Sequence, residues 1–117
     1  MKKETRLTLA IILGVLVLAG LILYLKKPAP PDIMEELAKC IGQNSVVYVQ
    51  TGCTHCIEQE AMFGDYVQYL TIVDCLKDNN IKECVSAGIG GTPTWIIKNQ
   101  TYPNVRTIEE LKELTGC

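Results

Sequence analysis

An uncharged apolar stretch near the N-terminus divides this chain into two parts with different constraints. Residues 7–25 read LTLAIILGVLVLAGLILYL and include no charged side chain. As a helix rising about 1.5 Å per residue, the stretch is roughly 28 Å long, close to the thickness of a bilayer's hydrocarbon core. We therefore expect a transmembrane anchor at 7–25, after an N-terminal segment at 1–6. Residues 32–117 remain for one modest folded domain, which excludes a multidomain enzyme.

A cleaved signal peptide is the alternative interpretation of this stretch. The apolar region of a signal peptide is usually about 7 to 15 residues long, and no A-x-A pattern follows the run. Leu18-Ala19-Gly20 resembles a lipoprotein cleavage box, but Leu21 occupies the position of the acylated cysteine. We therefore expect an uncleaved signal anchor without an attached lipid.

The distribution of basic residues and cysteines predicts the topology of the chain. Three Lys or Arg precede the span and two follow it, which by the positive-inside rule favours a cytoplasmic segment at 1–6. All six cysteines follow the span, and persistent disulfides belong mainly to oxidising compartments outside the cytosol. We expect a single-pass protein of the cell membrane whose C-terminal domain lies on the extracytoplasmic side. A basic, proline-rich linker at 26–31 is expected to act as a short, stiff spacer.

The domain after the linker is acidic. Between Asp32 and Glu113 twelve acids accompany six Lys and Arg, a net charge of −6, against +4 for the first 27 residues. Nucleic-acid binding relies on clustered Lys and Arg that contact phosphates. We therefore expect no nucleic acid as a partner.

Hydrophobic periodicity and turn residues predict alternating helices and strands in 32–117. The order strand, helix, strand implies a parallel crossover, and a turn at Asn99-Gln100 makes an antiparallel hairpin of the last two strands. The last helix is expected to begin with a capping box of Thr107 and Glu110. The expected fold class is α/β, a mixed sheet with flanking helices after one transmembrane helix. The expected helices are 32–42, 54–69, 81–87 and 107–116, and the expected strands are 46–49, 70–74, 94–98 and 101–105.

Three further expectations concern single positions in the first two helices of the domain. Gly42 is expected to stop the first helix, and Gly64 to bend or weaken the second. Met62 and Phe63 are expected to lie in the core.

The candidate for chemistry is Cys53-Thr54-His55-Cys56, where the first strand gives way to the second helix of the domain. At a helix N-terminus, free N–H groups and the helix dipole stabilise an anion, so we expect a lowered pKa for Cys53. Cys56, one turn further on, can attack a mixed disulfide formed on Cys53. A protonated His55 would also stabilise the Cys53 thiolate and make the disulfide more oxidising. The pattern predicts a redox-active centre with Cys53 as nucleophile and Cys56 as resolving thiol.

Three other interpretations of these residues remain open. The CxxC could be half of a zinc site, but that site needs a second close pair, and Cys75 and Cys84 are separated by eight residues. It could be a structural disulfide, although a bridge at the start of a helix is open to exchange. His55 could be an ordinary surface histidine. No metal is expected.

The order strand, CxxC, helix, strand, then Gly91-Thr92-Pro93-Thr94-Trp95, a hairpin and a final helix resembles the thioredoxin fold. The resemblance covers about 45–117. It implies that the Thr92–Pro93 peptide bond is cis and that Pro93 lies against the active disulfide. It also implies that Thr92 offers its backbone to an extended substrate chain, so these two residues are the expected substrate-binding site.

Several segments carry a narrower resemblance: Leu37-Ala38-Lys39-Cys40, Cys53-Thr54-His55-Cys56, Met62-Phe63-Gly64, Val73-Asp74-Cys75, Cys84 and Pro93-Thr94-Trp95. Together they resemble the thioredoxin-like domains associated with vitamin K epoxide reductase homologues. This resemblance implies a DsbA-like role, in which the CxxC passes disulfides to secreted or cell-surface proteins that contain cysteines. A vitamin K epoxide reductase-like integral membrane partner, on a separate chain, would reoxidise the CxxC and pass the electrons to a quinone. This chain itself is expected to hold no cofactor besides its redox-active disulfide.

Two positions depart from these families. Thr54 replaces the proline common in the Cys-Pro-His-Cys motif of the narrower family, and Val47 stands where thioredoxin has a buried acid. The apolar Val47 fits an oxidant better than a general reductase.

The other four cysteines are expected to stabilise the domain. The resemblance implies a Cys75–Cys84 disulfide, which would close a small loop; exchange of this pair with the active pair is the functional alternative. Cys40 and Cys117 could form a further disulfide, a pairing reached by elimination. Cys40 could equally be a buried apolar residue, and Cys117 could be free or pair between chains.

These observations predict a membrane-anchored, extracytoplasmic thiol-disulfide oxidoreductase that oxidises client proteins. A reductase or isomerase supplied by a membrane electron carrier is the alternative within the same chemistry. A non-catalytic module that binds thiols or a metal is the alternative from another class.

Overall fold

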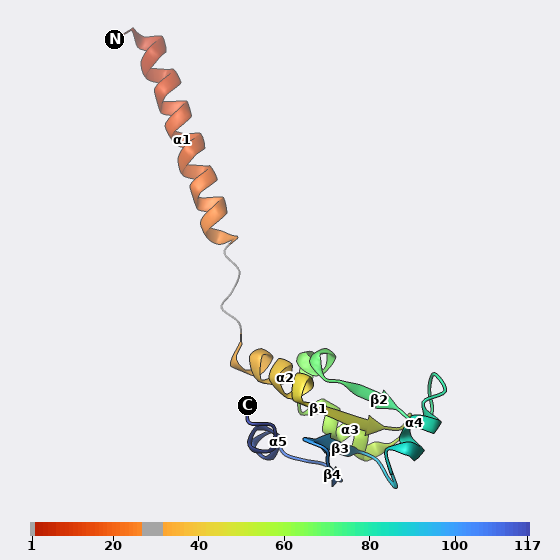
Figure 1. Cartoon of the computed structure of the whole chain (residues 1–117). Helices are drawn as coiled ribbons and strands as arrows, with labels where there is room; N and C mark the ends of the chain where they lie inside the picture. The colour runs from red at the N-terminus through yellow and green to blue at the C-terminus, as the bar shows by residue number, and fades with distance from the viewer. Residues whose placement is uncertain (1, 27–31) are drawn as a thin grey trace. The chain divides into compact units, whose positions relative to one another are not determined.

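The structure is a computed structural model of the chain and describes residues 2–26 and 32–117 (Figure 1). The chain divides into two compact units, Met1–Pro30 and Pro31–Cys117, which are described separately. The expected linker at 26–31 lies outside the described residues, apart from Lys26.

The first unit is formed by helix α1 (Lys3–Leu25). An 18-residue window of this helix has a mean hydropathy of 2.7, and none of its side chains is buried. The helix is therefore long and apolar enough to cross a membrane, and the expected span at 7–25 lies within it.

The second unit is built on a four-stranded mixed sheet with the strand order β2-β1-β3-β4. β1 pairs in parallel with β2, whereas β3 pairs antiparallel with both β1 and β4. The expected parallel pair and terminal hairpin are confirmed. The strands are β1 (Ser45–Val49), β2 (Ile72–Asp74), β3 (Thr94–Ile97) and β4 (Gln100–Pro103).

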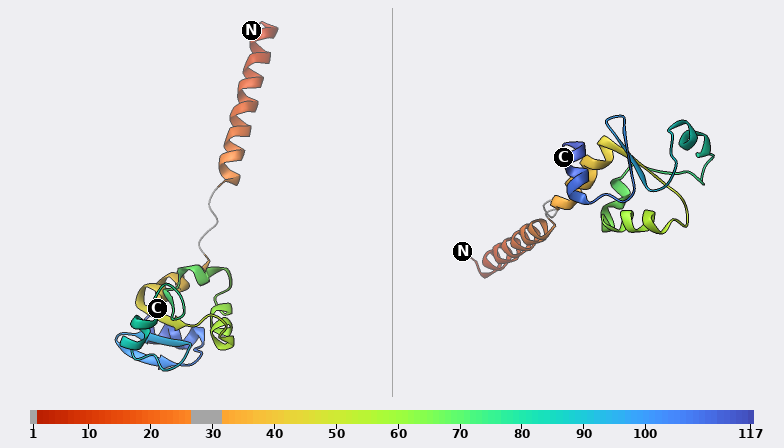
Figure 2. Two further views of the ribbon diagram at one scale, coloured as in Figure 1. Left: turned by 90° about the vertical axis from the view of Figure 1, so that its right-hand side faces the viewer. Right: turned by 90° about the horizontal axis from the view of Figure 1, so that it is seen from below.

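Helices cover both faces of this sheet. Alternate residues of β1 point to opposite faces, as in any strand, so Val47 and Val49 join the main core while Tyr48 joins a smaller one. The main core includes Trp95 of β3, and α2 and α5 lie side by side over it (Figure 2). The smaller core includes Cys84 of α4. The helices are α2 (Ile33–Asn44), α3 (Thr54–Ala61), the 3₁₀ helix η1 (Gly64–Tyr69), α4 (Ile81–Ser86) and α5 (Ile108–Thr115).

Local capping explains where two of these helices begin. The Asp32 carboxylate accepts a hydrogen bond from the Met34 backbone N–H at 3.1 Å, which starts α2. At α5, the Thr107 hydroxyl and the Glu110 carboxylate each accept from the other's backbone N–H, at 3.1 and 2.9 Å. The expected capping box is therefore confirmed.

One close approach joins α2 to the end of η1. A Cβ atom at Gly42 would overlap the Tyr69 carbonyl oxygen, so only glycine fits there. The Thr71 hydroxyl then donates to the Gly42 carbonyl at 2.7 Å. Gly42 was expected to stop the helix, but α2 continues through it to Asn44, and its role is to allow this contact.

The expected helix over 54–69 is interrupted. α3 ends at Ala61, and Gly64 has a φ of +53°, which a right-handed helix does not contain, so the chain continues as the separate 3₁₀ helix η1. The break leaves Met62 36% exposed while Phe63 is buried against Trp95. The expectation that both side chains are in the core was wrong for Met62.

The hairpin turn differs from the expectation by one residue. Lys98 and Asn99 both have positive φ, at +51° and +62°, whereas Gln100 already belongs to β4. A two-residue turn of this kind matches the twist of the two strands, and their pairing forces Lys98 into a conformation that its own sequence does not favour.

Candidate redox site

Cys53 and Cys56 lie where the chain leaves β1 and enters α3. Gly52, with a φ of +83°, turns the chain, and the Cys53 N–H donates to the Gln50 carbonyl at 3.1 Å. Cys53 is the N-cap of α3, and its sulfur accepts from the Cys56 N–H at 3.2 Å. The two cysteines form a disulfide with their Cα atoms 5.2 Å apart.

The two sulfurs of this disulfide differ in exposure. Cys53 is half-buried, whereas Cys56 belongs to the main core and is only 2% exposed. A thiol from another molecule therefore has access to the Cys53 side of the bond. The Cys56 sulfur lies on the buried side of the disulfide, toward the main core.

The segment Thr92–Pro93 lies beside Cys53, although 39 positions separate Thr92 from it in the sequence. The Thr92 hydroxyl is 3.5 Å and its carbonyl oxygen 3.6 Å from the Cys53 sulfur. The Thr92–Pro93 peptide bond is cis, and Pro93 is fully buried. The Pro93 carbonyl accepts from the Asn104 N–H at 2.9 Å. The segment Thr92–Pro93 therefore contacts Cys53 through Thr92 and Asn104 through Pro93.

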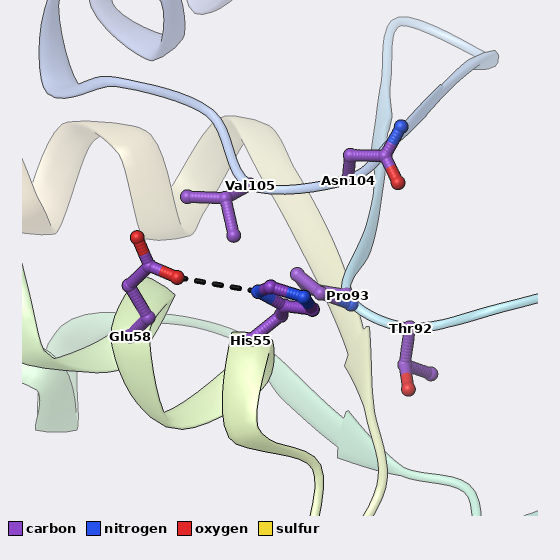
Figure 3. A pocket seen from close by; sticks show the side chains of 6 residues that line it. All are labelled: His55, Glu58, Thr92, Pro93, Asn104 and Val105. Carbon is purple, nitrogen blue, oxygen red and sulfur yellow. Dashed lines mark hydrogen bonds and ion pairs between the residues drawn. The ribbon is translucent and has the colours of Figure 1, made fainter.

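A pocket of about 380 Å³ opens next to this segment (Figure 3). His55 and Glu58 of α3 form one wall, and their Nδ1 and Oε2 atoms are 3.3 Å apart. His55 is 75% exposed, so its link to Glu58 is a surface contact. The lining residues are His55, Glu58, Thr92, Pro93, Asn104 and Val105.

Asp74 supports the turn that leads to Cys53. Its carboxylate accepts from the Thr51 hydroxyl at 2.6 Å and from the Thr51 N–H at 3.3 Å. The Leu76 N–H adds a third hydrogen bond at 3.0 Å. The Thr51 hydroxyl foremost, then these backbone donors and nearby Lys77, hold the pKa of Asp74 below its usual value.

Gln59 binds α3 to two other parts of the domain. Its side-chain oxygen accepts from the Trp95 indole N–H at 3.0 Å and from the Arg106 backbone N–H at 2.7 Å. Its side-chain nitrogen donates to the Arg106 carbonyl at 2.9 Å. Gln59 is 1% exposed.

Sequence reasoning did not single out Gln59, Asn104 or Val105 for the site, and it interpreted Glu58 as part of a solvated acidic helix face, with an effect on partner choice as the alternative. For Gln59 one signal existed: it lies three residues after Cys56, on the face of α3 that is otherwise directed to the core. The partners of Gln59 and Asn104 come from other segments, which periodicity does not bring together, whereas Glu58 pairs with His55 on the same helix.

The remaining cysteines form two further disulfides. Cys75, directly after β2, is joined to Cys84 of α4, with a Cα–Cα distance of 5.9 Å. Cys40 of α2 is joined to Cys117, with a Cα–Cα distance of 6.0 Å. Over residues 2–26 and 32–117, no group of three or more His, Cys, Asp or Glu side chains is arranged to hold a metal ion.

A comparison with known proteins agrees with this chemistry. The chain is 38% identical over 71 residues to the thiol-disulfide oxidoreductase LTO1 of Arabidopsis thaliana, a match over 55% of this chain. This chain is similar to a thiol-disulfide oxidoreductase. It spans only 19% of the length of that relative. No known family profile matches the chain. The similarity and the disulfides together support a general thiol-disulfide redox role.

Proposed function

We propose that this protein is a membrane-anchored thiol-disulfide oxidoreductase in which Cys53 is the nucleophile and Cys56 the resolving thiol. The observation that carries the proposal is the Cys53–Cys56 disulfide at the start of α3, with Thr92 against its outer sulfur. The similarity to a thiol-disulfide oxidoreductase points to the same chemistry.

The proposed direction is oxidation of client proteins. A client thiolate attacks the Cys53 sulfur, the Cys53–Cys56 bond breaks, and Cys56 leaves with the electron pair. A second client thiolate then attacks the client sulfur of this mixed disulfide and releases Cys53 as a thiolate. The client has gained a disulfide, and Cys53 and Cys56 hold two electrons and take up the two client protons.

The residues around Cys53 favour its release. The Cys56 N–H at the helix N-terminus and the Thr92 hydroxyl both donate toward the Cys53 sulfur, and such donors stabilise a thiolate more than a thiol. A more stable thiolate leaves faster and makes the disulfide a stronger oxidant. We assign His55, when protonated, a smaller share in this effect, because it is exposed and paired with Glu58.

We propose a thioredoxin fold for the unit from residue 32 onward. The parallel β1–β2 pair, the antiparallel β3–β4 hairpin and the cis Thr92–Pro93 bond beside the CxxC support this assignment. In this fold, the Thr92 backbone would pair with an extended client segment, and the pocket beside it would receive a client side chain.

The cellular setting is proposed from the sequence. α1 would anchor the chain in the cell membrane with residues 1–6 in the cytoplasm and the domain outside. Secreted or cell-surface proteins would be the clients, so the process served would be oxidative protein folding. A vitamin K epoxide reductase-like membrane protein would take the two electrons from Cys53 and Cys56 and pass them to a quinone, and a shared membrane would raise the effective concentration of both proteins.

The first test is the equilibrium reduction potential of the Cys53–Cys56 pair against glutathione, measured on the full chain in detergent. We expect a value between about −120 and −200 mV, as for DsbA and protein disulfide isomerase. A value near −270 mV, as for thioredoxin, would support a reductase instead. A pair that never equilibrates with glutathione would make the bridge structural and overturn the proposal.

A trapping experiment separates turnover from simple thiol binding. Cys56→Ser should accumulate mixed disulfides through Cys53, because the resolving thiol is missing. The matched control is the double variant Cys53→Ser with Cys56→Ser, which should trap nothing. Equal trapping by both variants would show that Cys53 is not the nucleophile.

A further inference from the structure

Cys53 and Thr92 belong to elements that no covalent bond near the site holds together. Cys53 begins α3, while Thr92 precedes β3, and their contact depends on how α3 rests on the sheet. A shift of about 1 Å would lengthen the 3.5 Å distance between the Thr92 hydroxyl and the Cys53 sulfur beyond hydrogen-bonding range. The domain therefore needs a group that fixes α3 relative to residues 92–95.

Gln59 occupies this position. It lies on α3 one turn after Cys56, and its oxygen accepts from the indole N–H of Trp95, three residues after Thr92. Two side-chain contacts and two stretches of backbone therefore form a closed loop. Thr92 contacts Cys53 and Trp95 contacts Gln59, while the backbone joins Thr92 to Trp95 and α3 joins Gln59 to Cys53.

A second closed chain of contacts passes through Gln59. Its amide binds both the N–H and the carbonyl of Arg106, at 2.7 and 2.9 Å. Two residues earlier, the Asn104 N–H donates to the Pro93 carbonyl at 2.9 Å. Gln59 therefore holds the segment before α5, and that segment holds the carbonyl next to Thr92.

The side-chain amide of Gln59 uses its full hydrogen-bonding capacity. The oxygen accepts two hydrogen bonds, and the nitrogen donates to the Arg106 carbonyl and toward the Met62 sulfur at 3.6 Å. Gln59 is 1% exposed, and these four protein partners satisfy its amide without water. A buried amide with every partner in place permits one orientation, which suits a positioning role.

We propose that Gln59 is a positioning residue that holds the Cys53 sulfur against Thr92. It acts on the redox pair through α3 and through residues 92–95, without touching either sulfur. The inference rests on the proposed function, since it concerns the reactivity of Cys53 during exchange.

The experiment is a double-mutant cycle on the full chain in detergent. The variants are Gln59→Leu, Thr92→Val and the two combined, and the readout is the pKa of Cys53 after reduction of the Cys53–Cys56 pair. This pKa comes from the pH dependence of alkylation at Cys53, located by mass spectrometry. We expect each single variant to raise it by about 0.5 to 1 unit, and the combined variant by clearly less than the sum.

The control is Ser45→Ala. Ser45 is also a buried polar residue, bonded to the Ile41 carbonyl, but it lies at the opposite end of β1 from Cys53. We expect it to reduce stability without moving the pKa of Cys53. A purely structural Gln59 would behave in the same way, so an unchanged pKa in Gln59→Leu, or strictly additive shifts in the cycle, would overturn the proposal.

A second variant covers the case in which Gln59→Leu does not fold. Trp95→Phe keeps an aromatic ring in the core and removes the N–H that Gln59 accepts, together with part of the buried indole ring. It should raise the pKa of Cys53 by a smaller amount, again less than additively with Thr92→Val, and no shift would overturn the inference. Failure of the proposed function is a separate outcome, because it would appear as absence of exchange with glutathione in the unmodified protein.

Discussion

At the scale of single residues, two side chains near Cys53 are expected to differ in their effect on its thiolate. The Thr92 hydroxyl lies 3.5 Å from the sulfur in a half-buried setting, while His55 is 75% exposed and paired with Glu58. Solvent and counter-ions weaken a charge at the surface far more than a contact inside the site. The half-buried Thr92 is therefore expected to matter more for the reactivity of Cys53 than the exposed His55.

This difference predicts which of two substitutions raises the pKa of Cys53 more. Thr92→Val should raise the pKa of Cys53 more than His55→Ala does, because it removes a side-chain donor 3.5 Å from the sulfur. The measurement is the pH dependence of Cys53 alkylation in both variants. Thr71→Val is the control, since its hydroxyl binds Gly42 away from the site. A larger shift in His55→Ala would reverse this assignment.

Asp74 predicts a pH dependence of stability. Its folded-state pKa is lowered, so its hydrogen bonds stabilise the domain fully above its unfolded pKa of about 3.9. This contribution is lost as the pH falls below about 4, through the folded-state pKa, because a protonated carboxyl accepts hydrogen bonds poorly. Asp74→Asn should therefore be less stable than the unmodified protein at pH 7, and the difference should shrink at pH 3. Urea denaturation at both pH values measures this, and a difference that stays constant with pH would contradict it.

At the scale of elements, the contact between α2 and η1 depends on one glycine. Gly42→Ala gains helix propensity of about 1 kcal/mol, but the new methyl group overlaps the Tyr69 carbonyl and must push η1 away. Overpacking of this kind costs about 1 to 3 kcal/mol, so we expect a net loss of stability. Gly90→Ala is the matched control, because open space surrounds that position. Equal stability of the two variants in urea denaturation would show that η1 yields without cost.

The elements also show how far local pattern predicts structure. The strands, the capping box of α5 and the strand pairing followed from residues close together in the sequence. Gly64 was expected to bend or weaken the helix over 54–69, and the structure breaks it there into α3 and η1; the one-residue shift of the hairpin turn was not expected. A positive φ is readily accessible to Gly64, whereas Lys98 adopts one because it lies in the tight turn between the paired strands β3 and β4.

At the scale of the whole molecule, two disulfides close loops of very different length. Cys40 and Cys117 are 77 positions apart and join α2 to the end of the chain, whereas Cys75 and Cys84 are 9 apart. In the chain-entropy model, the stabilisation is about 4 to 5 kcal/mol for the long loop and about 2 to 3 kcal/mol for the short one. The long-range bridge is therefore expected to contribute more to a small domain.

The corresponding prediction compares two double variants. Replacing Cys40 and Cys117 by serine should lower the free energy of unfolding more than replacing Cys75 and Cys84. Denaturant titration of each variant in detergent, with α1 retained, gives the difference. A greater loss from the Cys75 and Cys84 variant would mean that packing around that bridge, near Tyr48, outweighs loop entropy.

Local sequence patterns were enough to predict the features that depend on neighbouring residues: an apolar helix long enough for a membrane, a mixed sheet, the helix caps, and a CxxC at a strand-to-helix junction. These features follow from local hydrogen bonding and side-chain periodicity, which act over a few positions. The resemblance had placed Thr92 and Pro93 beside the disulfide, but the contacts of Gln59 with Trp95 and Arg106 come from the packing of α3 on the sheet. Such contacts between distant segments depend on three-dimensional distance, and a sequence pattern carries no record of it.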